Sequence, residues 1–155
     1  MRERKLTRIP RSKAKTAYGL CMDVIRAIQA EPRRADMRVA VQIRDVSDPD
    51  APACGTVGCF AGWIMVLRQG REQTLNGNLC TYYVFNAENL LGHNICYLTA
   101  GRNNLYVFNS GEGDACETTT PGTPAHARAV VARIRKFVRI NKTALQARKL
   151  SKVRS

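Results

Sequence analysis

The side chains of this sequence best suited to chemistry are its cysteines and histidines. Cys54 and Cys59 are separated by four residues, and His93 and Cys96 by two. Together these four side chains are the ligand types of a tetrahedral zinc site. The alternative is that Cys59 and Cys96 are small buried apolar residues, which is the usual state of a free cysteine. No cofactor is therefore expected, and zinc is kept as the alternative.

Cys59 is also the type of residue that acts as a catalytic nucleophile. It lies near the predicted start of a helix, where the pKa of a thiol is lowered, and His93 or His126 would serve as its base. Neither histidine is followed by a recognisable acidic partner, and Cys59 opens an apolar segment. Burial of Cys59 is the simpler interpretation. The chain is therefore predicted not to be an enzyme, and a cysteine-dependent enzyme stays as the third alternative.

The basic residues form a stronger pattern, because they gather at the two ends of the chain. The 155 residues carry a formal net charge of +13 at pH 7. Residues 1–15 contain seven cations and one acid, and residues 126–155 contain ten cations and no acid. The cations predicted to bind a polyanion are Arg2, Arg4, Lys5, Arg8, Arg11, Lys13, Lys15, Arg128, Arg135, Arg139, Lys142, Arg148, Lys149, Lys152 and Arg154.

Such basic ends are typical of proteins that bind nucleic acid through its phosphates, with little sequence preference. Aromatic residues are scarce in both ends, and Phe137 is predicted to lie in the core, so contacts to the backbone are favoured over base stacking. The predicted function is non-enzymatic nucleic-acid binding, in a virion or another nucleoprotein assembly. The main alternative is a structural accessory or an inhibitor protein that binds an acidic protein surface.

Local patterns predict the elements that position these residues. A helix is expected over 16–30, capped by Thr16, and a buried core helix over 59–67, capped by Thr56 and closed by Gly70. A terminal helix is expected from Pro124 to about residue 150, with Thr123 as its cap and Val130, Val131, Ile134, Phe137 and Val138 on its core face.

The middle of the chain is predicted to be of mixed type. Residues 37–43 alternate like a strand, and residues 73–85 resemble a hairpin because Asn76-Gly77 lies between apolar runs. Short helices are expected over 87–91, capped by Asn86, and over 95–100, with a strand over 105–108 and a loop over 109–122. The fold class is therefore α+β, a mainly helical small single domain with a β-hairpin and basic N- and C-terminal extensions.

Three segments, CGTVGCFAGW (54–63), AENLLG (87–92) and TPAHARAVVARIRKF (123–137), occur in that order. Together they resemble a group of small bacterial and bacteriophage proteins that carry a Cys-Gly-Thr-x-x-Cys-x-Ala-Gly-Trp core helix. The resemblance covers roughly residues 16–140. It implies a mainly helical domain and a phage or prophage origin, but no activity and no catalytic residue. This chain departs from that group in its two basic ends.

The expected division of the chain is a flexible basic arm at 1–15, a globular domain at 16–140 and a basic extension at 141–155. Removal of both ends is expected to leave the domain folded. No apolar run reaches the roughly 18 residues of a membrane span, and no apolar segment follows the basic N-terminus as in a secretory signal. The expected location is the cytoplasm or a particle assembled there, with the cysteines reduced.

Overall fold

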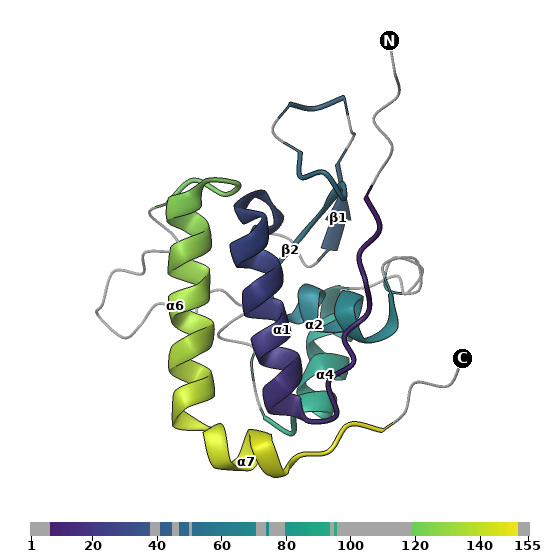
Figure 1. Cartoon of the computed structure of the whole chain (residues 1–155), viewed down its shortest axis with the longest axis vertical. Helices are drawn as coiled ribbons and strands as arrows, with labels where there is room; N and C mark the ends of the chain where they lie inside the picture. Colours follow the sequence, from purple (N-terminus) through teal and green to yellow (C-terminus); the bar gives the residue numbers. More distant parts are fainter. Residues whose placement is uncertain are drawn as a thin grey trace.

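The computed structural model describes residues 7–37, 41–44, 47–49, 51–70, 74, 80–93, 95 and 119–151. Within these ranges, five α-helices surround an apolar core, and one antiparallel strand pair packs against them. Figure 1 shows three of the helices, α1, α2 and α6, in the centre and left of the molecule. The predicted fold class, a mainly helical α+β domain with a hairpin, is confirmed.

Helix α1 (Ala17–Ala30) is the central support of the fold. The Thr16 side chain accepts a hydrogen bond from the backbone N–H of Gly19 at 3.2 Å, so the predicted N-cap is confirmed. Its apolar residues recur at helical spacing and are fully buried between α2 and α6. They are Ala17, Leu20, Cys21, Val24, Ile25 and Ile28.

Helix α2 (Phe60–Gln69) is the predicted core helix, and its residues from Phe60 to Leu67 are all buried. The predicted cap was wrong, because Thr56 lies in a strand and Cys59 precedes the first helical residue. Gly70 ends the helix with φ of +95°, as predicted, a conformation that residues with a Cβ rarely adopt.

Helix α6 (Pro124–Ile140) begins at Thr123, whose side chain accepts from the backbone N–H of His126 at 3.3 Å. The predicted core face is confirmed, and the Phe137 ring meets Phe60 of α2 edge-on at 6.1 Å. The predicted continuation to residue 150 was wrong. Helix α6 ends before Asn141, whose backbone and side-chain N–H groups both donate to the carbonyl of Phe137 at 3.0 Å. Helix α7 (Lys142–Ala147) follows and buries Leu145 completely.

The hairpin lies elsewhere in the chain than predicted. Strand β1 (Val41–Ile43), inside the predicted strand 37–43, pairs antiparallel with β2 (Thr56–Gly58). Helix α4 (Cys80–Leu91) occupies much of the predicted hairpin 73–85 and packs against α2. Packing of α4 as a whole against α2 favours the helix over the local strand preference of this segment.

Helix α4 also absorbs the predicted short helix 87–91, so Asn86 lies inside a helix and is not a cap. Gly92 closes α4 with φ of +70°, and its N–H donates to the carbonyl of Glu88 at 2.7 Å. The predicted helix 95–100, the strand 105–108 and nearly all of the loop 109–122 lie outside the described residues.

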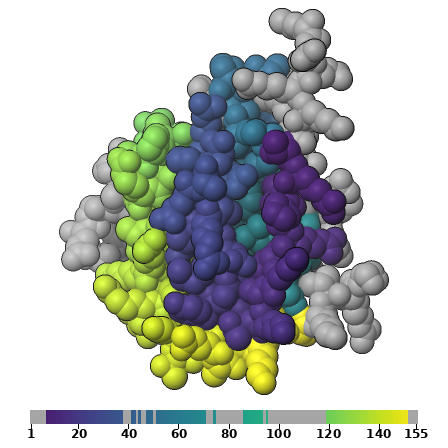
Figure 2. All heavy atoms as spheres, viewed as in Figure 1, coloured from purple at the N-terminus to yellow at the C-terminus, as the bar shows by residue number. Residues whose placement is uncertain are grey.

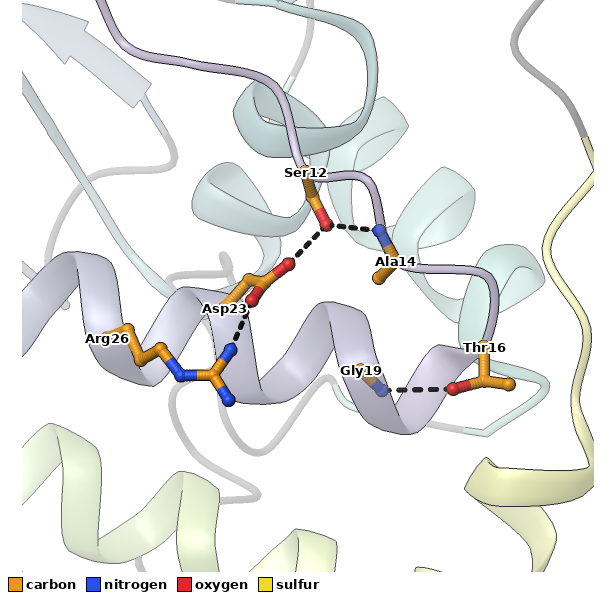
Figure 3. Close-up of polar contacts among 6 residues, drawn as sticks. All are labelled: Ser12, Ala14, Thr16, Gly19, Asp23 and Arg26. Atoms are coloured by element: carbon orange, nitrogen blue, oxygen red, sulfur yellow. Dashed lines mark hydrogen bonds and ion pairs between the residues drawn. The ribbon is translucent and has the colours of Figure 1, made fainter.

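The N-terminal segment was predicted to be a flexible arm, but residues 7–15 pack along the helices (Figure 1). The N–H of Ser12 donates to the carbonyl of Leu67 at 2.8 Å. The Ser12 hydroxyl donates to the carboxylate of Asp23 on α1 at 2.5 Å and accepts from the N–H of Ala14 (Figure 3). Backbone and side-chain bonds therefore hold this segment against α1 and α2.

None of the helices in the described residues is both long and apolar enough to cross a bilayer.

Candidate nucleic-acid interface

Helix α6 carries a row of exposed cations on the side away from the core. The spacing of Arg128, Arg135 and Arg139 places them on one stripe, because 7 and 11 residues are close to two and three helical turns. From Arg128 to Arg139 the stripe is about 16 Å long, which matches the rise of about five base pairs. Lys136 borders it and Lys142 continues it onto α7. We call these five exposed side chains the α6 basic face.

The charge of the α6 basic face is not neutralised locally. Residues 118–155 contain ten cations and no acid. Among the described residues, no ion pair or hydrogen bond engages the side chains of the α6 basic face. Several of the acids that the structure describes elsewhere have other contacts, such as Asp36 with Arg44 and Glu88 with the N–H of Ile95. Within the part of the chain that the structure describes, the α6 basic face is therefore a row of positive charge with no acidic partner.

A groove lies beside this face, where α6 passes α1. It has a volume of about 530 Å³. Apolar parts of Tyr18 and Met22 from α1 and of Ala132 and Val138 from α6 line it. Four members of the α6 basic face border it, namely Arg135, Lys136, Arg139 and Lys142. Figure 2 shows that α1, α6 and α7 share one face of the molecule. We call this feature the α1–α6 groove.

The two basic ends, which are far apart in the sequence, meet in space. The N–H of Leu150 donates to the carbonyl of Lys15 at 2.8 Å, and the N–H of Ala17 donates to the carbonyl of Arg148 at 2.9 Å. Thr16 and Lys149 thus form an antiparallel bridge. The sequence analysis treated the ends as separate extensions, whereas this pairing makes one surface of them.

Two arginines of the basic ends lie at the C-termini of helices. Arg148 donates to the carbonyls of Asn89 and Leu90 at 2.7 and 3.4 Å, at the C-terminus of α4. Arg11 lies against Gly70 at the end of α2, where an added Cβ would come within 3.3 Å of its Nε atom. A cation is favourable at both places, because the C-terminus of a helix carries partial negative charge. The hydrogen bonds hold the Arg148 guanidinium in position, and both residues remain exposed.

Around these arginines the exposed or half-exposed cations form a second basic surface, the joined-end surface. Its described members are Arg11, Lys13, Lys15, Arg68, Arg148 and Lys149. A pocket of about 620 Å³ opens in it, lined by three of these cations together with Asn86, Asn89 and Ser151. Arg68 and Lys136 were not among the predicted binding residues. Lys136 lies in the basic C-terminal region, and Arg68 lies at the end of the predicted core helix.

The other predicted basic residues are placed as follows. Arg8 is exposed on the N-terminal segment. Arg2, Arg4, Lys5, Lys152 and Arg154 lie outside the described residues.

The predicted zinc ligands that the structure describes lie in or beside the apolar core. Cys54 and Cys59 are free thiols that expose none of their surface, and His93 packs edge-on against Phe137 at 5.9 Å. Cys96 lies outside the described residues. In the ranges that the structure describes, no three side chains of His, Cys, Asp or Glu come together in a metal-binding group. Burial of Cys59 agrees with the interpretation of this residue as part of the core.

The candidate catalytic base His126 is itself buried, with an exposed fraction of 1 %. Its Nε2 atom accepts a hydrogen bond from the N–H of Met37 at 3.3 Å, so the proton of the neutral ring lies on Nδ1 and faces Thr119 Oγ1 at 3.1 Å. These contacts tie the start of α6 to the segment before β1. The arrangement is that of a core histidine.

Burial also sets the chemistry of Cys21, which the sequence analysis did not single out. Loss of hydration inside the core raises the pKa of the Cys21 thiol to about 12. A thiol that stays protonated at neutral pH is a poor nucleophile and a poor metal ligand. Cys21 therefore acts as an apolar packing residue of α1.

Comparison with known proteins found no matching family model, no matching curated protein and no matching solved structure.

Proposed function

We propose that this chain binds nucleic acid through the phosphate backbone and catalyses no reaction. The observation that carries the proposal is the α6 basic face, a row of exposed cations without acidic neighbours on its own or the following helix. Each cation that contacts a phosphate releases condensed counterions, which makes such a row an effective binder of nucleic acid. Contacts to phosphates position a protein on nucleic acid without reading its sequence, so little sequence preference is expected.

The joined-end surface supports the same function. Backbone pairing of Lys15 with Leu150 fixes the basic ends before any partner binds. A preformed basic surface loses less conformational entropy on binding than a free tail does. Both surfaces would then contribute phosphate contacts, and a nucleoprotein assembly such as a phage virion is the setting that we propose for them.

Replacement of two arginines of the α6 basic face by glutamine tests the proposal. In the double variant Arg135→Gln/Arg139→Gln, the slope of log K against log salt for a DNA duplex should become shallower by about 1.8, since each lost contact removes about 0.9. The matched control is Arg26→Gln/Arg33→Gln, which removes the same charge from exposed residues outside both basic surfaces. The control should keep the slope of the unmodified chain.

The measurement is fluorescence anisotropy of a labelled duplex across a salt series, with urea unfolding to verify that each variant is folded. Equal losses in the two double variants would show that only net charge matters and would overturn the role of the α6 basic face. Absence of binding to duplex and single strands at low salt would overturn nucleic acid as the partner. An acidic protein surface would then be the partner to seek.

A further inference from the structure

The α1–α6 groove contains more than positive charge. Its border carries Arg135, Lys136, Arg139 and Lys142, and its α1 side carries the ring of Tyr18 and the thioether of Met22. Tyr18 and Met22 are only half buried, although their neighbours Ala17 and Cys21 are fully buried. An aromatic ring thus remains accessible next to four cations that the described residues leave unpaired.

The occupant of such a groove needs a flat apolar part and negative charge close to it. A nucleotide in a single strand offers both, because its base is free to leave the stack while its phosphate stays in the backbone. In a duplex the bases are paired inside the helix, and the phosphates are what a groove of this kind would meet. The combination of Tyr18 with the cations therefore favours a single strand over a duplex.

The length of the apolar part argues in the same direction. Tyr18 and Met22 are separated by one helical turn, about 6 Å. An acidic amphipathic helix docks through a row of large apolar anchors over two or more turns. Among the described residues, α6 adds only the small side chains of Ala132 and Val138 to the apolar lining of the groove. One base with its neighbouring phosphates fits the available combination of ring and charge better.

From these observations we infer that the α1–α6 groove binds single-stranded nucleic acid, with a base against Tyr18 and Met22 and the adjacent phosphates on Arg135, Arg139 and Lys142. This inference rests on the proposed function and adds the strandedness of the ligand. It also gives a base contact to a protein whose basic ends contain almost no aromatic residues.

The test compares a labelled oligothymidylate with a duplex of the same length, by anisotropy at one salt concentration. The unmodified chain should bind the single strand more tightly. Tyr18→Leu, which keeps an apolar side chain but removes the ring, should weaken single-strand binding by about tenfold and leave duplex binding unchanged. Tyr18→Phe should retain the single-strand affinity, because its ring still stacks.

A second variant keeps the inference testable if Tyr18→Leu does not fold. Arg135→Gln on the exposed side of α6 should reduce the salt slope for the single strand by about 0.7, whereas Arg33→Gln should not change it. Loss of this difference between the two variants would overturn the inference.

The remaining outcomes separate this inference from the proposed function. Equal affinity for single strand and duplex, with no effect of Tyr18→Leu, would overturn the inference and leave backbone binding intact. If no nucleic acid binds at all, both proposals fail. If Tyr18→Leu instead weakens only the binding of a polyglutamate peptide, the groove is a peptide site, and the inference is likewise overturned.

Discussion

At the scale of single residues, Asp23 is the contact that holds the N-terminal segment to α1. Its carboxylate accepts from the Ser12 hydroxyl and from the Arg26 guanidinium, each at 2.5 Å (Figure 3). The Arg26 side chain is 68 % exposed, whereas that of Asp23 is 29 % exposed. The Ser12 bond is therefore the better shielded of the two and should contribute more to stability.

We expect Asp23→Ala to lower the free energy of unfolding by about 1.5 kcal/mol, the usual value for a hydrogen bond to a charged group. The control Arg26→Ala removes only the exposed ion pair and should cost about 0.5 kcal/mol or less. Urea unfolding of both variants measures the difference. Equal losses would show that the Ser12 contact adds nothing to stability and would contradict its role in holding the segment to α1.

The buried thiol of Cys21 predicts how the stability of the fold depends on pH. Its thiol has an ordinary pKa of 9.0 when unfolded and about 12 in the folded chain. Between these values the unfolded state loses its proton first, so the contribution of Cys21 to stability is complete below pH 9 and is lost as the pH rises towards 12. Cys21→Ala should flatten the fall of stability over this window in urea titrations, and an unchanged pH profile would contradict the burial of this thiol.

At the scale of elements, substitutions in α7 show whether this C-terminal helix contributes to the apolar core. Leu145 is completely buried, and α7 packs against α1. We expect Leu145→Ala to lower the free energy of unfolding by about 3 kcal/mol, because it leaves a cavity in the core. Gln146→Ala, at an exposed position of the same helix, should change it by less than about 0.5 kcal/mol. If the two variants unfold alike, α7 does not contribute to the core.

The elements also show what could be predicted from the sequence. The caps at Thr16 and Thr123, the end at Gly70 and the apolar face of α6 were predictable, because each depends on residues within one or two turns. Helix α4 was not, since Tyr82 and its neighbours prefer strands locally and their helix is stabilised by packing on α2.

The candidate site was predictable only in part, for the same physical reason. The cations of α6 follow from their spacing along one helix. The α1–α6 groove depends on the meeting of α1 and α6, so Tyr18 and Met22 could not be assigned to it from periodicity alone. The pairing of Lys15 with Leu150 likewise joins segments that no local pattern connects.

At the scale of the whole molecule, the segments around Lys15 and Leu150 pair with each other on the surface of the domain. A chain truncated after residue 141 would lose Leu145 from the core and the backbone partners of Lys15 and Ala17. We therefore expect its melting temperature to fall by about 10 °C, given about 3 kcal/mol from Leu145 alone. Differential scanning calorimetry measures this fall, and an unchanged melting temperature would restore the earlier prediction of a dispensable extension.

Because truncation is expected to destabilise the domain, substitution of single cations is the better way to examine binding. The central claim is that the exposed cations bind phosphates, and the affinity of the intact chain for nucleic acid across a salt series tests it most directly. Five contacts from the α6 basic face predict a slope of log K against log salt of about −4.5 for a duplex, and a steeper one if the joined-end surface also binds. A slope near zero, or no binding at low salt, would contradict the claim.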